Sequence, residues 1–188
     1  GSQSSNNVLL RALFQMGIPV SGKNMFPSNI KGLPTWFSVR LSKDGYVARR
    51  KETQIVVCMN PQTCRKDLES LQPGGLCIFD QPLGLGGARK DIESLAVPFA
   101  QLMAAIPDTD VRLRSLLANM CYVGVLAELL AIEPAEVERA LRKQFKQKEK
   151  AVALNLRAVE AGAAFARGQY RGPRRFRVLG LYEDYTWP

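Results

Sequence analysis

Two short apolar runs joined by a helix signal constrain the fold of this chain more than any other feature. Residues 55–59 are Ile-Val-Val-Cys-Met and residues 76–79 are Leu-Cys-Ile-Phe. Continuous apolar runs of this length are typical of parallel strands buried on both faces, so the first predicts a central strand. Asn60 as N-cap and Pro61 as first helical residue predict a helix to about Leu71. The strand–helix–strand order predicts a parallel crossover and the α/β class.

Polar residues follow both predicted strands. Asn60 comes directly after the first, at the carboxyl end, where open α/β sheets bind ligands. Asp80 ends the second and is the best lone carboxylate for catalysis, but an aspartate in this position is more often a cap or turn former. Residues 73–75, Pro-Gly-Gly, predict a turn, and the glycine-rich residues 80–90 predict a connection.

A polar loop and a hairpin are predicted for residues 21–50. Glycine, proline, serine, asparagine and lysine fill the first half, and residues 36–41 alternate as a strand. Asp44-Gly45 predicts the turn that leads back into a second strand over residues 46–50. Lys23 and Lys31 could supply charges for a phosphate, or could be incidental lysines of a solvated loop.

The rest of the chain is predicted to be mainly helical. Apolar residues recur at helical spacing over residues 4–16, 113–132 and 149–166, and Pro134 opens a further helix. Gly124 would permit close contact between helices. The serines before the first helix predict either an anion site or an ordinary capped helix.

Composition excludes several chemistries. The 188 residues contain no histidine, which rules out histidine acid–base catalysis and most zinc or haem sites. Four cysteines without a paired motif predict buried, reduced thiols in a cytoplasmic protein and no metal ligation. The formal charge of +9 favours an anionic partner. We interpret the basic run over residues 139–150 as the solvated face of two helices, and we expect no membrane partner.

The domain organisation predicted from composition is simple. Residues 1–170 form one α/β domain, and residues 171–188 form a basic linker or tail toward a following domain.

Several motifs in order resemble a known family. They are Gly-Ser-Gln-Ser-Ser-Asn-Asn at residues 1–7, Met-Gly-Ile-Pro-Val-Ser-Gly-Lys-Asn at 16–24, Phe-Pro-Ser-Asn-Ile-Lys-Gly-Leu-Pro-Thr-Trp at 26–36, Cys-Met-Asn-Pro-Gln-Thr at 58–63, and Asn-Met-Cys-Tyr-Val-Gly at 119–124. Together they resemble the gamma domain of 2-oxoacid:ferredoxin oxidoreductases. The 2-oxoglutarate type, in which this domain begins a fused alpha subunit, is the most similar.

The resemblance implies an α/β fold: a three-layer, Rossmann-like, mostly parallel sheet with a β-hairpin and a helical C-terminal part. It implies that the assembled enzyme decarboxylates a 2-oxoacid on thiamine diphosphate, transfers the acyl group to coenzyme A and passes electrons through iron–sulfur clusters to ferredoxin. Thiamine diphosphate, its magnesium and the clusters would be held by other domains. This chain would help to hold coenzyme A, would assemble with the other subunits, and would be inactive alone.

The implied cofactor-binding residues follow from the matched motifs. Ser2 and Asn6 fall at the glycine loop and helix start, Lys23, Asn24, Ser28, Asn29 and Lys31 fall in a loop at the active-site entrance, and Asn60 falls in an Asn-Pro turn. No catalytic or metal-binding residue is expected in this chain. The alternative is a stand-alone nucleotide- or nucleic-acid-binding α/β protein, although no stacking platform for single strands is evident.

Overall fold

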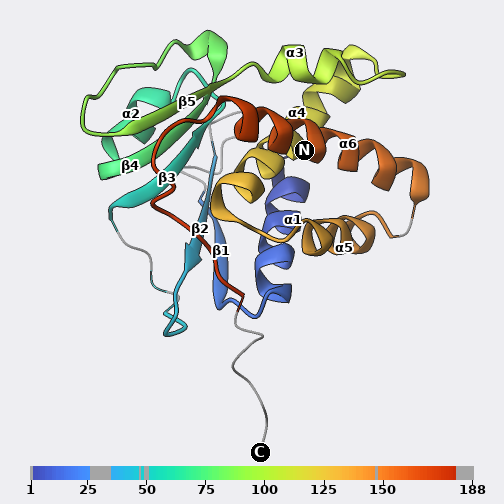
Figure 1. The fold of residues 1–188 in the computed structure, drawn as a ribbon, viewed down its shortest axis with the longest axis horizontal. Helices are drawn as coiled ribbons and strands as arrows, with labels where there is room; N and C mark the ends of the chain where they lie inside the picture. Colours follow the sequence, from blue (N-terminus) through green and yellow to red (C-terminus); the bar gives the residue numbers. More distant parts are fainter. Residues whose placement is uncertain (1, 26–34, 47, 49–50, 147, 181–188) are drawn as a thin grey trace, which may run out of the picture. The chain divides into compact units, whose positions relative to one another are not determined.

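The chain forms two compact units. The computed structural model describes residues 2–25, 35–46, 48, 51–146 and 148–180 (Figure 1). Unit 1 comprises Gly1–Gly22, Val39–Val47 and Ala100–Pro188, and unit 2 comprises Lys23–Ser38 and Ala48–Phe99.

A three-stranded parallel sheet forms the centre of unit 2. Its strands are β3 (Thr53–Cys58), β4 (Leu71–Asp80) and β5 (Glu93–Val97), in the order β3-β4-β5. Helix α2 (Cys64–Glu69) connects β3 to β4, and a short 3₁₀ helix, η1 (Gln81–Leu83), follows β4 (Figure 1). The predicted parallel crossover is confirmed.

Three details of this crossover differ from the sequence prediction. Strand β3 lies at the edge of the described sheet, and Cys58 is its one buried residue, so the prediction of a central, fully buried strand was wrong. The helix begins at Cys64, because the residues after Asn60 first form a turn. Strand β4 already begins at Leu71, and residues 72–75 form an irregularity within it instead of a turn between elements. An apolar run indicates a strand, but it does not indicate the position of that strand in the sheet. That position depends on pairing with residues far away in the sequence.

The hairpin joins β1 (Val20–Met25) to β2 (Trp36–Leu41). The prediction of β2 is confirmed, and the Gly45 N–H donates to the Ser42 carbonyl at 3.1 Å in the predicted turn region. Of the predicted partner strand over residues 46–50, residues 47, 49 and 50 lie outside the described residues, and Tyr46 and Ala48 are not in a strand. β2 pairs with β1. Lys23 and Asn24, predicted in a loop, therefore lie on a strand. Backbone pairing with β2 builds this strand although its side chains lack apolar alternation.

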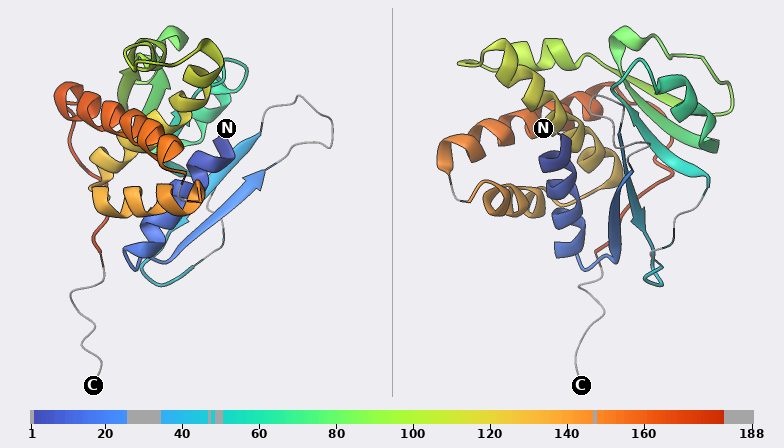
Figure 2. Two further views of the ribbon diagram at one scale, coloured as in Figure 1. Left: turned by 90° about the vertical axis from the view of Figure 1, so that its right-hand side faces the viewer. Right: turned by 180° about the vertical axis from the view of Figure 1, so that it is seen from behind.

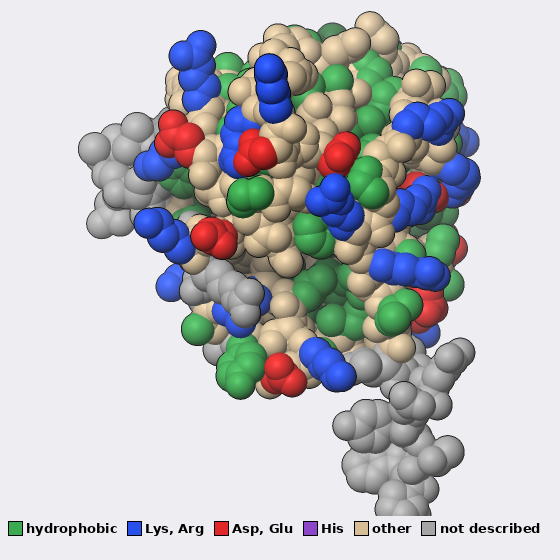
Figure 3. Space-filling model, turned by 60° about the vertical axis from the view of Figure 1, so that its left-hand side comes forward, with side chains coloured by type: hydrophobic (Ala, Val, Ile, Leu, Met, Phe, Trp, Pro, Cys, Tyr) green, Lys and Arg blue, Asp and Glu red, His purple; other side chains and the backbone are tan. Residues whose placement is uncertain are grey.

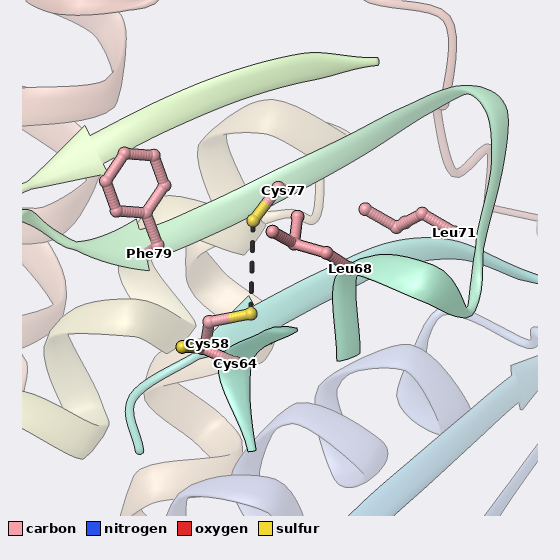
Figure 4. Close-up of a cluster of buried hydrophobic side chains, with 6 residues drawn as sticks. All are labelled: Cys58, Cys64, Leu68, Leu71, Cys77 and Phe79. Carbon is pink, nitrogen blue, oxygen red and sulfur yellow. Dashed lines mark hydrogen bonds between the residues drawn. The ribbon is translucent and has the colours of Figure 1, made fainter. Parts of the chain in front are cut away.

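One apolar cluster fills the space between α2 and the sheet of unit 2. Cys58, Cys64, Leu68, Leu71, Cys77 and Phe79 are all buried in it (Figure 4). The Sγ atoms of Cys58 and Cys77 are 3.9 Å apart, and their contact together with burial raises the pKa of the Cys58 thiol. All four cysteines are free and buried, so the prediction of buried, reduced thiols is confirmed.

Unit 1 is mainly helical. It contains α1 (Ser2–Gln15), α4 (Val111–Leu130), α5 (Pro134–Gln144) and α6 (Glu149–Gln169), and α3 (Phe99–Ala104) precedes α4 in the chain. These helices agree with the predictions to within a few residues. Helix α4 is long and apolar enough to cross a membrane, but 61% of its apolar window is buried in the structure, as expected for a core helix.

Helices α4 and α6 pack side by side through two glycines (Figures 1 and 2). A Cβ atom added at Gly124 would lie 1.9 Å from the carbonyl oxygen of Val159, and one at Gly162 would lie 2.1 Å from the carbonyl oxygen of Cys121. The backbones therefore approach more closely than any side chain would allow, which confirms the prediction for Gly124.

The basic segment after α6 is bound to the C-terminal end of α4. Arg174 donates to the Glu128 carbonyl and carboxylate, Arg167 donates to the same carboxylate at 2.7 Å, and the Val178 N–H donates to the Leu130 carbonyl at 2.7 Å. Burial of the Glu128 carboxylate opposes its ionisation, but the two arginines outweigh this effect and lower the pKa of Glu128.

This carboxylate should make stability depend on pH. A lowered folded pKa contributes stability above the unfolded pKa, and that contribution is lost as pH falls through the folded pKa. We expect Glu128→Gln to reduce the free energy of unfolding by about 1 kcal/mol at neutral pH, and by progressively less as the pH falls below the usual pKa of a glutamate. Urea unfolding at neutral pH and at a series of acid pH values measures this trend. Glu149→Gln is the control: its side chain is 71% exposed, and it should cost less than about 0.5 kcal/mol. If Glu128→Gln lowers the free energy of unfolding as much at acid pH as at neutral pH, the ionised Glu128 carboxylate is not the source of the stability.

Candidate functional site

The predicted site residues fall in different parts of the structure. Ser2 and Asn6 lie on α1 in unit 1, whereas Lys23, Asn24 and Asn60 belong to unit 2. Ser28, Asn29 and Lys31 lie outside the described residues. The described candidates therefore form two groups, one in each unit.

The first turns of α1 carry both exposed and buried polar groups. Ser2 is exposed, and the Asn6 Oδ1 accepts a hydrogen bond of 2.7 Å from the Tyr122 hydroxyl on α4. Burial raises the pKa of Tyr122, so this hydroxyl stays a donor. The Asn6 side chain thus helps to pack α1 on α4. Only its Nδ2 amide group could donate a hydrogen bond to a ligand.

The register of the hairpin decides which side chains share a face. The Ser42 N–H donates to the Pro19 carbonyl at 3.2 Å, so these two residues are directly opposite each other. Continued along both strands without a bulge, this register places Lys23 opposite Ser38 and Met25 opposite Trp36. Opposite residues of an antiparallel pair point to the same face. Lys23 therefore shares its face with Trp36, whereas Asn24 faces the other way.

A chain of hydrogen bonds joins Trp36 to the turn that contains Asn60. The indole Nε1–H donates to Asp67 Oδ1 at 2.7 Å, and the Thr63 hydroxyl donates to Asp67 Oδ2 at 2.8 Å. The Asn60 carbonyl accepts from the N–H groups of Thr63 and Cys64, at 3.2 and 3.1 Å. Its side-chain oxygen accepts from the Gln62 N–H at 2.9 Å. Residues 36 and 60, which belong to separate sequence motifs, are thus held in one network.

Lys66 is an additional residue of this site that the sequence analysis did not identify. It lies on α2, is exposed, and its Nζ is 5.7 Å from the centroid of a Trp36 ring. This distance allows a cation–π contact. The two residues are far apart in sequence and no spacing rule connects them, so only the tertiary structure could bring them together. We call Lys23, Trp36, Asn60, Thr63, Lys66 and Asp67 the Trp36 cluster.

Asp80 is the last residue of β4 and directly precedes η1. Burial raises the pKa of Asp80, although backbone N–H groups of Phe99 and Gln81 act in the opposite direction. Its Oδ1 is buried and has no hydrogen-bond partner among the described residues. Asp80 occupies the N-cap position of η1, but its side chain makes no capping hydrogen bond to that helix.

The two arginines of the basic run at the junction of α5 and α6 are paired with acidic residues. Arg142 bridges Glu138 and Glu149, at 2.8 and 3.0 Å, and Arg139 pairs with Glu136 at 3.0 Å. On the face shown in Figure 3, lysine and arginine side chains are scattered among acidic ones instead of forming one patch. The ion pairs of Arg139 and Arg142 are consistent with the interpretation of this run as the solvated face of two helices.

Comparison with known sequences gives a consistent result. Residues 1–165 match the family described as pyruvate ferredoxin/flavodoxin oxidoreductase. The chain is 18% identical to subunit alpha of 2-oxoacid:ferredoxin oxidoreductase 2 from Aeropyrum pernix, over 95% of this chain and 35% of that protein. It therefore spans about a third of the length of this relative.

Comparison with solved structures shows the same fold in enzymes of this kind. The 2-oxoglutarate:ferredoxin oxidoreductase from Magnetococcus marinus, solved with 2-oxoglutarate, coenzyme A and succinyl-CoA bound, aligns with a TM-score of 0.74 at 23% identity, over 95% of this chain and 30% of that one. The gamma subunit of a keto/oxoacid ferredoxin oxidoreductase from Geobacter sulfurreducens aligns with a TM-score of 0.70 at 18% identity, over 89% and 94%. The subunit PORC of pyruvate oxidoreductase from Thermotoga maritima aligns with a TM-score of 0.67 at 16% identity, over 87% and 89%. The predicted fold class is confirmed: a parallel sheet, a hairpin and C-terminal helices.

Proposed function

Since the chain belongs to the pyruvate ferredoxin/flavodoxin oxidoreductase family, we propose that it is the gamma domain of a 2-oxoacid:ferredoxin oxidoreductase and has a non-catalytic role. In this role it helps to hold coenzyme A and to assemble a cytoplasmic, multi-subunit enzyme. The assembled enzyme would oxidatively decarboxylate a 2-oxoacid, form acyl-CoA and reduce ferredoxin.

The Trp36 cluster is the observation that supports this role. It combines an exposed lysine on β1, an ordered indole and the Asn60 turn within unit 2. Lysine ammonium groups and an aromatic surface suit a ligand with phosphates and a heterocycle, and coenzyme A has both. Ser2, Asn6, Asn24, Ser28, Asn29 and Lys31 remain in the proposed binding set.

The redox cofactors of the reaction do not fit the described residues of this chain. The chain has no histidine, and its four cysteines are buried, with no group of three or more metal-ligating side chains among the described residues. Iron–sulfur clusters need several thiolates around one site. We therefore assign the clusters to other domains; thiamine diphosphate and magnesium are assigned there only because the family resemblance implies it, and we derive no step through any of them.

Isothermal titration of coenzyme A into the assembled enzyme tests the proposal. Lys23→Ala removes one charge from the Trp36 cluster and should weaken binding roughly fivefold, which corresponds to about 1 kcal/mol. Lys43→Ala, an equal change of charge in the turn region after β2, should leave affinity unchanged. Equal affinities for wild type and Lys23→Ala would refute the site. Oxidation of a 2-oxoacid by this chain alone would refute the non-catalytic role.

A further inference from the structure

Two thiols lie in contact in the apolar cluster of unit 2. The Sγ atoms of Cys58 and Cys77 are 3.9 Å apart, and the dashed line in Figure 4 joins them. The two side chains are 1% and 0% exposed. Both are free thiols, and neither belongs to the Trp36 cluster. The pair is in contact but is not bonded, since a disulfide has an S–S length of about 2 Å.

The register of the parallel sheet explains why these thiols meet. Cys77 pairs directly with Val56, the residue two positions before Cys58. Because side chains alternate along a strand, both cysteines lie on the face of the sheet that α2 covers. Cys77 is in the middle strand β4, whereas Cys58 is the last residue of β3, an edge strand of the described sheet. A shift of about 2 Å at the end of β3 would bring the two sulfur atoms to bonding distance.

The other two cysteines are placed differently. Cys64 is buried in the same cluster, but its Sγ donates to the Pro61 carbonyl at 3.3 Å. Cys121 lies on α4 in unit 1, and burial raises the pKa of its thiol to about 12. In the contact pair, the hydrogen bond with Cys58 lowers the pKa of the Cys77 thiol, although burial acts in the opposite direction. Since the thiolate is the reactive form, Cys77 is the better nucleophile of unit 2 and Cys121 should be inert.

We propose that Cys58 and Cys77 form a reversible disulfide when the protein meets a peroxide. The Cys77 sulfur attacks one peroxide oxygen, the O–O bond breaks, and the leaving hydroxide takes the thiol proton as water. The Cys58 sulfur then attacks the resulting sulfenic acid, the S–O bond breaks, and the hydroxyl leaves as water with the Cys58 proton. Two thiols are oxidised, and one peroxide is reduced to two waters.

This bond would give unit 2 a redox-dependent state. It would close a covalent loop over residues 58–77, which contains α2 and the Asn60 turn. Because Asn60 follows Cys58 by two residues, the shift at the end of β3 would be passed to this turn. The inference does not rest on the proposed function, since it uses the geometry of the apolar cluster alone.

Peptide mapping of the full chain after treatment with hydrogen peroxide tests the inference. Free thiols are alkylated and the protein is digested with trypsin, which releases residues 52–65 with Cys58 and Cys64, and residues 67–89 with Cys77. We expect these two peptides to be linked in the native protein and to separate after reduction. The link should form at least about tenfold faster than Cys121 is oxidised. Cys64→Ser should retain the link, and Cys58→Ser should abolish it.

Protein unfolded in urea is the matched control. There Cys58 should pair mainly with Cys64, inside residues 52–65, because the shorter loop closes at a lower entropic cost. Three results would overturn the inference. Native protein could show the same pairing as unfolded protein, Cys58 and Cys77 could remain reduced or be oxidised without a link, or Cys121 could be oxidised as fast as the pair. The first and second are read from wild type, so they do not depend on the folding of a variant.

Discussion

Replacing Gly124 by alanine is expected to destabilise unit 1 by at least about 3 kcal/mol, the upper range for overpacking of a close-packed interior. The new methyl group would lie 1.9 Å from the Val159 carbonyl oxygen. That atom belongs to the backbone of α6, so relief requires the two helices to separate. Alanine favours a helix by only about 1 kcal/mol over glycine, which cannot offset the clash.

The chain supplies a matched control on the same pair of helices. Gly168 lies near the end of α6, and a Cβ atom there would have no neighbour within 4 Å. Gly168→Ala should therefore raise stability by up to about 1 kcal/mol. Urea unfolding monitored by far-ultraviolet circular dichroism measures the stability of unit 1 in both variants, because most helical residues belong to this unit. If Gly124→Ala lowers the free energy of unfolding by no more than about 1 kcal/mol, α4 and α6 are not packed this closely.

The second large effect is expected at Phe79. This side chain is 2% exposed and lies in the apolar cluster beneath α2 (Figure 4). Phe79→Ala should reduce the stability of unit 2 by about 3–5 kcal/mol, because it removes an aromatic ring from a packed core and leaves a cavity. Fluorescence of Trp36 reports the unfolding of unit 2, since its indole is bonded to Asp67 on α2. Trp187, the other tryptophan of the chain, would be replaced by phenylalanine in every variant.

Two controls separate loss of packing from loss of an aromatic ring in general. Phe79→Leu retains most of the side-chain volume. Its loss in free energy of unfolding should be roughly half that of Phe79→Ala or less. Phe14→Ala changes a side chain that is 72% exposed and should stay within about 0.5 kcal/mol of wild type. Similar losses for Phe79→Ala and Phe14→Ala would show that burial in the cluster is not the cause.

Local patterns were sufficient for elements whose signals lie within a few residues. The C-terminal end of α1 illustrates this: Gly17 adopts a positive φ of 74°, and the Ile18 N–H donates to the Leu13 carbonyl, as in a helix that ends at a glycine. The long apolar period of α4 and the parallel crossover around α2 were predicted for the same reason.

Pairing between strands could not be predicted in the same way. β1 contains Ser21, Gly22, Lys23 and Asn24, residues typical of a loop, and its strand conformation comes from hydrogen bonds with β2. The apolar run of β3 correctly indicated a strand, but its edge position follows from β4 pairing with β5 on the other side. Backbone hydrogen bonds carry no side-chain signature, so composition alone cannot report them.

The same division applies to the candidate site. The amino-acid sequence by itself determined the α/β class, the helical C-terminal part, the absence of histidine chemistry and the resemblance that pointed to Lys23 and Asn60. Only the tertiary structure placed Lys23 on a strand beside Trp36, turned Asn24 to the opposite face and brought Lys66 over the indole. The reason is physical: local sequence sets helix periods and caps, whereas strand register and the contact between α2 and β2 depend on residues about thirty positions apart, such as Trp36 and Asp67.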